Sequence, residues 1–232
     1  MTHHHHHELL SDPAHTALLL VDIQPDFMND GPLATADGDA IVPGVRELME
    51  SVPCGVMVAT QDWHPAGHVS FASSHQGREP FETIELHGHE QVLWPEHCVQ
   101  GTPGAKLASG LPWERVDLIL RKGCDPQSDS YSGFRNNWDA EGKRPATGLA
   151  GYLRERDIHT VLACGLARDV CVQWTAEDAV EAGFRTGFIW DLTRPVTHDN
   201  DQDCQQALKN AGVHIVEAAD LHAGGGTTGR SA

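Results

Sequence analysis

Short apolar segments recur along the chain, separated by stretches with helical spacing. Their residues are apolar at successive positions and do not alternate with polar ones, which is typical of strands buried on both faces of a parallel sheet. The pattern therefore predicts six strands, at Ala17–Ile23, Gly55–Thr60, Val116–Leu120, Thr160–Gly165, Phe184–Ile189 and Val213–Val216.

Two of the intervening stretches have the amphipathic spacing of surface helices. Val170–Glu181 is followed by Gly183, and Asp201–Ala211 is followed in the same way by Gly212. Alternating strands and helices predict a three-layer α/β/α fold with a six-stranded, mainly parallel sheet. In such a sheet ligands bind at the carboxyl ends of the strands, so functional residues are expected at that edge.

One long stretch, Trp63–Trp113, breaks this rhythm, and we predict no strand or long helix within it. Irregular segments of this length are usually functional or disordered. Its three tryptophans and several histidines argue against disorder. The stretch is therefore expected to take part in function.

The two ends of the chain lack the pattern of a fold. The consecutive histidines His3–His7 resemble a tag or a disordered tail, so they are set aside from site reasoning. The last residues are rich in glycine and threonine. We expect one folded, catalytic domain at 16–220, between disordered tails at 1–15 and 221–232.

Charge and composition narrow the classes of function. The net charge of −17 repels phosphate and anionic lipid, so neither nucleic acid nor a membrane is expected as a partner. The apolar run Ala17–Val21 is too short for a membrane helix and follows no basic segment. Six cysteines in a chain that needs no disulfide staples indicate a reduced, cytoplasmic setting.

Ionisable side chains stand where two of the predicted strands end. Asp22 stands at the carboxyl end of the first strand, where it either caps a turn or pairs with a lysine, or acts as a general base with a pKa raised by apolar surroundings. Lys122 follows the third strand and, taken alone, is equally consistent with a solvated lysine.

Among the cysteines, Cys171 is the best placed to be a nucleophile. It lies in the first turn of the helix predicted after the fourth strand. Partial positive charge at a helix N-terminus lowers a thiol pKa and supplies N–H donors for an oxyanion. The alternative interpretation is a buried, inert thiol.

The long loop begins with a spacing that suits metal binding. Asp62 and His64 are two apart, so on an extended chain they point to the same side, and His97 is our third ligand. Two histidines and a carboxylate leave positions open for water or substrate. The rivals are Cys98, which would favour a closed structural zinc site, and the histidines His68, His75, His87 and His89.

Five motifs, in matching order between about Ala17 and Ala218, resemble those of the nicotinamidases, a family of the isochorismatase-like cysteine hydrolases. These motifs are Val21-Asp-Ile-Gln-Pro-Asp-Phe27, Asp62-Trp-His-Pro-Ala-Gly-His-Val-Ser-Phe71, Trp94-Pro-Glu-His-Cys-Val-Gln-Gly-Thr102, Lys122-Gly123 and Gly165-Leu-Ala-Arg-Asp-Val-Cys-Val172.

The resemblance implies a catalytic triad of Asp22, Lys122 and Cys171. It implies hydrolysis of nicotinamide to nicotinate and ammonia through a thioester on Cys171, with pyrazinamide as a side substrate. It also implies a substrate site at Leu166 and Ala167, joined by a cis peptide, and an oxyanion held by the backbone N–H groups of Ala167 and Cys171.

The resemblance further implies that Asp62, His64 and His97 hold one divalent ion, to which the pyridine nitrogen binds. Zinc is the expected ion, with iron and manganese as alternatives, since two histidines and a carboxylate suit all three. Ser70 matches the family position that contacts the ion, often through water, and His68 is then not a ligand.

Phe27 and Trp94 match the aromatic residues that pack on the substrate ring in this family. Two features depart from the family pattern and are expected to reshape the pocket rim. Arg168 stands where a small or hydroxyl residue is frequent, and Asn136–Thr147 is a polar insertion.

Two other functions stay open at this point. A ureido or carbamoyl amidohydrolase of the same superfamily would share the aspartate, lysine and cysteine, but such enzymes generally lack the Asp-x-His motif. A catalytically silent metal-binding scaffold would have no reactive thiolate at Cys171. The implied partner is a small-molecule substrate, and a homo-oligomer is compatible with the sequence.

Overall fold

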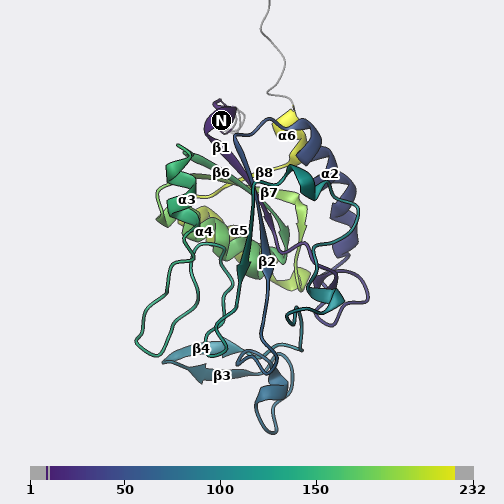
Figure 1. The fold of residues 1–232 in the computed structure, drawn as a ribbon, viewed down its shortest axis with the longest axis vertical. Helices are drawn as coiled ribbons and strands as arrows, with labels where there is room; N and C mark the ends of the chain where they lie inside the picture. Colours follow the sequence, from purple (N-terminus) through teal and green to yellow (C-terminus); the bar gives the residue numbers. More distant parts are fainter. Residues whose placement is uncertain (1–8, 10, 223–232) are drawn as a thin grey trace, which may run out of the picture.

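A computed structural model describes Leu9 and residues 11–222 of the chain. Its main sheet has six strands, all paired in parallel, in the order β5-β2-β1-β6-β7-β8 (Figure 1). This confirms the predicted fold class. The strands are β1 (Thr16–Val21), β2 (Val56–Asp62), β5 (Leu118–Lys122), β6 (Thr160–Leu166), β7 (Arg185–Arg194) and β8 (His214–Val216).

Helices cover both faces of this sheet (Figure 1). In β1, Leu18 and Leu20 pack in a core shared with α2 and α6, whereas Leu19 packs in a second core shared with the other helices. Burial on both faces explains the continuous apolar run of β1. The helices are α2 (Val42–Ser51) and α6 (Ala218–His222) on one face, and α3 (Leu149–Glu155), α4 (Gln173–Glu181) and α5 (Asp201–Ala211) on the other.

The two predicted helices are present, with one change at a boundary. Helix α5 ends at Ala211 and is followed by Gly212, whose φ of 86° is left-handed. The segment predicted as one helix from Val170 instead begins with a π-helical turn at Arg168–Val172, and α4 follows it. The pattern did not reveal α2, α3 and α6.

The order of the strands reverses beside β1. The chain builds β2 and β5 on one side of β1 and then crosses to build β6, β7 and β8 on the other. Parallel sheets of this kind bind ligands at the carboxyl ends of the strands that flank such a switch. The carboxyl ends of β1, β2 and β6 are therefore where the fold leaves room for a site.

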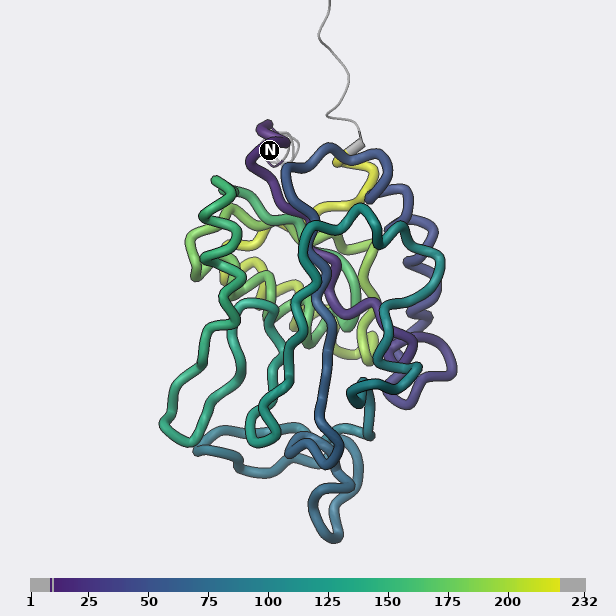
Figure 2. The backbone as a smooth tube through the Cα atoms, in the orientation of Figure 1, coloured from purple at the N-terminus to yellow at the C-terminus, as the bar shows by residue number. Residues whose placement is uncertain are grey.

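The prediction of no strand in Trp63–Trp113 is wrong. This stretch contains an antiparallel hairpin of β3 (Thr83–Leu86) and β4 (His89–Val92). Most of its side chains are exposed or half-buried, so no apolar run marks it. Its turn residues, His87 and Gly88, both have positive φ, as two-residue hairpin turns require. Figure 2 shows the hairpin beyond the carboxyl end of the sheet.

The ordered chain extends past both expected ends of the domain. Leu9 is 1% exposed and its side chain lies beside Gly187 of β7. At the other end, Leu221 of α6 is 2% exposed. Leu9, residues 11–15 and residues 221–222 therefore belong to the described fold, and the rest of the expected tails at 1–15 and 221–232 lies outside the described residues. His3–His7 lie outside the described residues.

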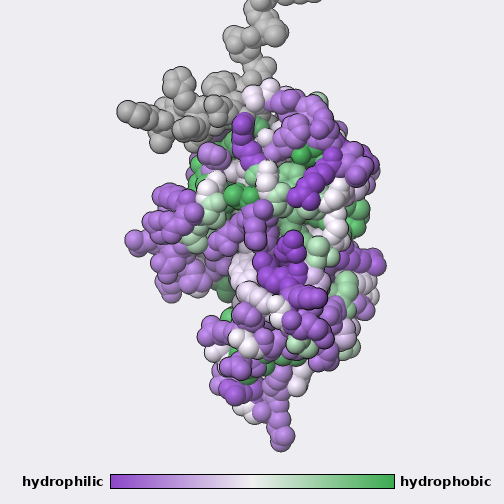
Figure 3. All heavy atoms as spheres, turned by 90° about the vertical axis from the view of Figure 1, so that its left-hand side faces the viewer, coloured by the Kyte–Doolittle hydropathy of each residue, from purple (hydrophilic) through white to green (hydrophobic). Residues whose placement is uncertain are grey.

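The surface is mainly polar where it can be followed. The face in Figure 3 is covered mostly by hydrophilic residues, with hydrophobic ones in small scattered groups. Among the described residues, no helix combines the length and apolar character needed to cross a membrane.

Candidate active site

Three residues, each at or just beyond the end of a different strand, meet at the carboxyl edge of the sheet. Asp22 directly follows β1, Lys122 is the last residue of β5, and Cys171 lies in the π-helical turn after β6. The Lys122 Nζ is 2.8 Å from Asp22 Oδ2 and donates to Cys171 Sγ at 3.5 Å. All three side chains are buried. The structure thus brings together the three residues that the sequence analysis grouped as a triad.

The two oxygens of Asp22 have different surroundings. Thr60 donates its hydroxyl to Oδ1 at 2.7 Å. The other oxygen, Oδ2, is paired with the Lys122 ammonium at 2.8 Å and has no further hydrogen-bond partner among the described residues. Burial raises the pKa of Asp22, although the charge of Lys122 opposes this. Oδ2 is therefore the oxygen available to take a proton.

The thiol of Cys171 is not a preformed thiolate. Burial raises its pKa well above the ordinary value, and this outweighs the opposing charge of Lys122. The lowering expected from a helix N-terminus is wrong here, because removal of the buried Cys171 from water is the largest influence on its pKa and raises it. A neutral thiol needs a base at the moment of attack.

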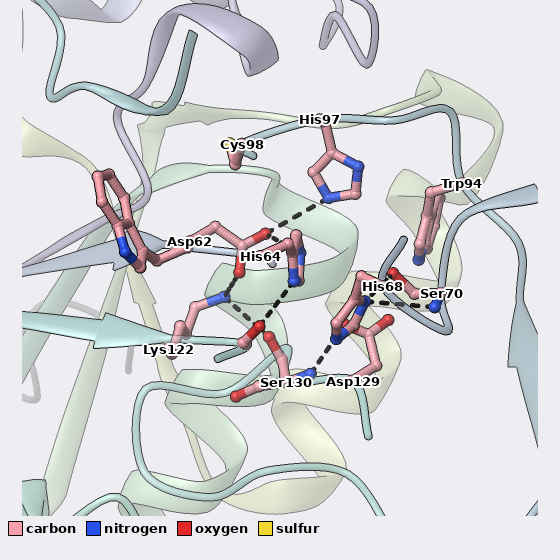
Figure 4. A network of polar contacts seen from close by, with 12 residues as sticks. Asp62, His64, His68, Ser70, Trp94, His97, Cys98, Lys122, Asp129 and Ser130 are labelled. Atoms are coloured by element: carbon pink, nitrogen blue, oxygen red, sulfur yellow. Dashed lines mark hydrogen bonds and ion pairs between the residues drawn. The ribbon is translucent and has the colours of Figure 1, made fainter. Parts of the chain in front are cut away.

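The second group of residues consists of Asp62, His64 and His97. The Asp62 Oδ2 lies 3.0 Å from His64 Nε2 and 3.4 Å from His97 Nε2 (Figure 4). All three side chains are buried, and one ligand atom from each lies within 4.8 Å of the others. Two imidazoles and a carboxylate converging in this way form a candidate site for a divalent metal ion.

Backbone carbonyls orient both imidazoles of this group. The Nδ1 of His64 lies 2.9 Å from the Gly123 carbonyl oxygen, and the Nδ1 of His97 lies 2.7 Å from that of Pro95. A donating Nδ1–H leaves each Nε2 with its lone pair directed toward Asp62. Contacts of this kind fix the tautomer and ring orientation of metal-binding histidines. The residues present therefore fit a divalent ion.

Lys122 connects the two groups. Besides Asp22 it contacts Asp62, whose Oδ1 is 3.1 Å from Nζ, and it donates to the Ser130 carbonyl at 2.9 Å. Although burial works against its charge, Asp22 and Asp62 hold the pKa of Lys122 well above its usual value. One buried ammonium thus balances two buried carboxylates.

Ser70 and His68 lie next to this group. The Ser70 hydroxyl is 2.7 Å from His68 Nδ1, and the His68 ring is 4.2 Å from that of His64 between centroids. His68 Nε2 is engaged by the Asp125 carbonyl oxygen at 2.9 Å. Contact between Ser70 and an ion through water stays a prediction.

A small cavity opens between the two groups of residues. Predicted residues that line it are Phe27, Asp62, Trp94, His97, Ala167 and Cys171. Leu166 is fully buried, is not among the described residues that line the cavity, and is joined to Ala167 by the cis peptide that the resemblance implied.

The sequence analysis missed five residues of the cavity wall. They are Leu33, Asp129, Tyr131, Val170 and Val196. Tyr131 receives a hydrogen bond from Trp94 Nε1 at 3.3 Å, which joins a predicted wall residue to a missed one. Asp129 and Tyr131 belong to the loop after β5, whose sequence carries no strand or helix pattern. Arg168, expected at the rim, is not among the described residues that line the cavity.

A substitution at Gly123 tests the metal site without replacing any of the three proposed ligands. We expect Gly123→Ala to weaken metal binding by about 10- to 100-fold, the usual effect of disturbing residues that support the ligands. A Cβ here would stand 2.5 Å from His64 Cε1 and 2.8 Å from its Nδ1, so the ring must move. Zinc affinity measured by competition with a chelating dye would show this.

Gly142→Ala is the matched control for this substitution. Gly142 has a φ of +72°, close to the +68° of Gly123, but nothing lies within 4 Å of its Cβ position. It therefore reproduces the backbone strain without the collision. Equal zinc affinity in the two variants would contradict the assigned site.

Comparisons with known proteins agree with this geometry. Residues 16–220 match the family model described as the isochorismatase domain. The chain is 43% identical to the nicotinamidase of Acinetobacter baylyi over 206 residues, which cover 88% of this chain and 94% of that protein.

Two solved structures extend the agreement to three dimensions. A nicotinamidase/pyrazinamidase of Acinetobacter baumannii superposes with a TM-score of 0.84 at 43% identity, covering 90% of this chain and 99% of that one. The pyrazinamidase of Pyrococcus horikoshii in complex with zinc gives a TM-score of 0.69 at 33% identity, covering 88% and 99%. The chain therefore belongs to the isochorismatase-like hydrolases and, within them, to the nicotinamidases.

Proposed function

We propose that the protein hydrolyses nicotinamide to nicotinate and ammonia. The observation that carries this proposal is the contact of Asp22, Lys122 and Cys171 beside a small cavity that is also lined by His97 and Asp62. A nucleophile and a base with its orienting cation suit acyl transfer. The relatives named nicotinamidase support the choice of substrate.

The cavity suits a flat aromatic amide. Phe27 and Trp94 present aromatic surfaces for the pyridine ring, and Phe27 also packs on His97 with 5.4 Å between ring centroids. When bound by Asp62, His64 and His97, a divalent ion would offer the pyridine nitrogen an open coordination position. Zinc is the ion we expect, with iron and manganese as alternatives.

Attack begins with a proton transfer between neighbouring side chains. The Cys171 thiol gives its proton to Asp22 Oδ2 as Sγ forms a bond to the carboxamide carbon. The negative charge that develops on the carbonyl oxygen is held by the backbone N–H groups of Ala167 and Cys171. The Lys122 ammonium stabilises the added negative charge around Sγ and keeps Asp22 in place.

Collapse of the tetrahedral intermediate releases the first product. Asp22 returns the proton to the amide nitrogen, the C–N bond breaks and ammonia leaves, so that a thioester on Cys171 remains. A water molecule then gives a proton to Asp22 and attacks the thioester carbon. The C–S bond breaks, the thiol regains its proton from Asp22, and the nicotinic acid that forms releases its remaining acidic proton to solvent as nicotinate.

The direct test is ammonia release from nicotinamide by the purified protein, before and after treatment with a strong chelator. We expect activity that is lost on chelation and restored by zinc, iron or manganese, with pyrazinamide hydrolysed as well. If the metal-treated protein released no ammonia from nicotinamide, this result would contradict the proposal. Activity on a ureido or carbamoyl compound in its place would move the assignment to that branch of the superfamily.

A further inference from the structure

Arg168 stands between the two residues whose N–H groups are proposed to hold the oxyanion. It follows Ala167 directly and precedes Cys171 in the same π-helical turn. Its side chain is only 5% exposed and is not among the described groups that line the cavity. A buried guanidinium is costly unless its donors are paired, so its partners are informative.

All the recorded partners of the guanidinium lie at the end of β7 and the start of α5. Arg168 Nε donates to Thr193 Oγ1 at 2.9 Å, and Nη2 donates to the Thr193 carbonyl at 2.9 Å and the Trp190 carbonyl at 3.3 Å. Nη1 pairs with Asp201 Oδ1 at 2.8 Å. The guanidinium also covers the Trp190 ring, 4.0 Å from its centroid.

These carbonyls lie where β7 leaves its ladder with β6. Ala163 of β6 pairs with Phe188 of β7, whereas Gly165 of β6 pairs with Thr193 of β7. Strand β7 therefore contains a bulge between Phe188 and Thr193. A bulge leaves backbone groups without ladder partners. Arg168 supplies donors to two carbonyls of this bulge, at Trp190 and Thr193, and so ties the turn to an otherwise irregular strand.

The next residue makes a parallel set of contacts. Asp169 Oδ1 accepts the Val196 N–H at 2.9 Å, and Asp169 Oδ2 accepts from Asn200 Nδ2 at 2.8 Å. Val196 lines the cavity. The turn that carries Cys171 is thus held on the segment from β7 to α5 by two adjacent side chains.

We propose that Arg168 is a positioning residue that holds the Ala167 and Cys171 N–H groups at the spacing the oxyanion requires. This inference rests on the proposed hydrolysis. The metal ligands and the aromatic wall come from other segments, so loss of Arg168 should impair the chemical step and leave ring binding intact. Displacement of a reacting group by about 1 Å costs about 100-fold in rate.

The test compares Arg168→Ala and Arg168→Lys with the unsubstituted, metal-loaded protein. For Arg168→Ala we expect kcat to fall about 10- to 100-fold while KM for nicotinamide stays within about 2-fold. Lysine keeps the charge but lacks the planar set of donors, so it should recover only part of kcat. The aldehyde analogue pyridine-3-carbaldehyde adds a second measurement.

The Cys171 thiol gives its proton to Asp22 as Sγ forms a bond to the aldehyde carbon, and the C=O double bond becomes a C–O⁻ oxyanion, while no group leaves. Affinity for the aldehyde should weaken by the same factor as kcat, whereas affinity for nicotinate should not change. Arg144→Ala is the control, because Arg144 forms a bidentate pair with Asp178 of α4, so its loss is also expected to cost stability. Contrary to expectation, no residue of Asn136–Thr147, Arg144 included, is among the described residues that line the cavity. This control should keep kcat and aldehyde affinity.

Three results would overturn the proposal: an active, folded Arg168→Ala with unchanged kcat, a loss confined to KM, or an equal loss of kcat in Arg144→Ala. If Arg168→Ala does not fold, Arg168→Lys and Asp201→Asn decide the matter by the same readouts. No ammonia from the unsubstituted protein would instead contradict the proposed function.

Discussion

Replacing Cys171 by alanine is expected to abolish turnover, with kcat falling by about 10⁴- to 10⁶-fold. Losses of this size are typical when the nucleophile of a catalytic triad is removed, because the three residues act as a unit. The proton acceptor Asp22 and its partner Lys122 would remain, but no atom would be left to form the thioester. Ammonia release under saturating nicotinamide measures this loss. Metal content should not change, because Asp62 and the two histidines lie on other segments.

Cys164→Ala is the control for this prediction. Cys164 is fully buried in β6, burial raises the pKa of its thiol to about 12, and it is not among the described residues that line the cavity, so we expect it to take no part in the reaction. This variant should lose some stability and keep kcat. Activity in Cys171→Ala above about one hundredth of the unsubstituted protein would exclude the thioester route.

The central strands β1, β2 and β6 were predictable because both of their faces are buried. In β1 every residue is buried, so the apolar run and the strand nearly coincide. The hairpin of β3 and β4 was not predictable from the same signal, because only Gln91 among its strand residues is buried. Strand β7 runs on from the predicted end at Ile189 to Arg194, through a bulge that Arg168 stabilises.

The candidate site was predictable to the extent that its residues stand at strand ends. Asp22 and Lys122 could be grouped because parallel strands bring their carboxyl ends to one edge. Asp129 and Tyr131 could not be assigned to the site, because the direction of their side chains depends on how the loop after β5 packs. That loop is held by contacts distant in sequence, such as the stacking of Trp138 on His89 at 3.8 Å.

The direction of the Cys171 pKa shift also could not be predicted from the sequence. A position near a helix start predicts a lowered pKa, but the shift depends on how completely the thiol is removed from water. Tertiary packing decides that, and here it raises the pKa. The raised pKa makes the neighbouring base, Asp22, a requirement of the chemistry.

Lys122→Met is expected to damage both stability and catalysis. The change leaves the buried carboxylates of Asp22 and Asp62 without the ammonium that contacts both. Removing one partner of a buried ion pair costs about 3 to 5 kcal/mol. Loss of a group that stabilises charge in the transition state should lower kcat about 10²- to 10³-fold. Urea unfolding of the chelated protein and ammonia release of the metal-loaded protein measure the two effects.

A second substitution separates charge balance from catalysis. Adding Asp22→Asn to Lys122→Met removes one of the unpaired carboxylates, so the double variant should recover part of the lost free energy of unfolding. It should recover no activity, because the amide cannot accept the Cys171 proton. Lys106→Met, at an exposed lysine, should change stability by no more than about 0.5 kcal/mol. If the double variant were no more stable than Lys122→Met, the ammonium would not be balancing Asp22, and its role would be confined to Asp62.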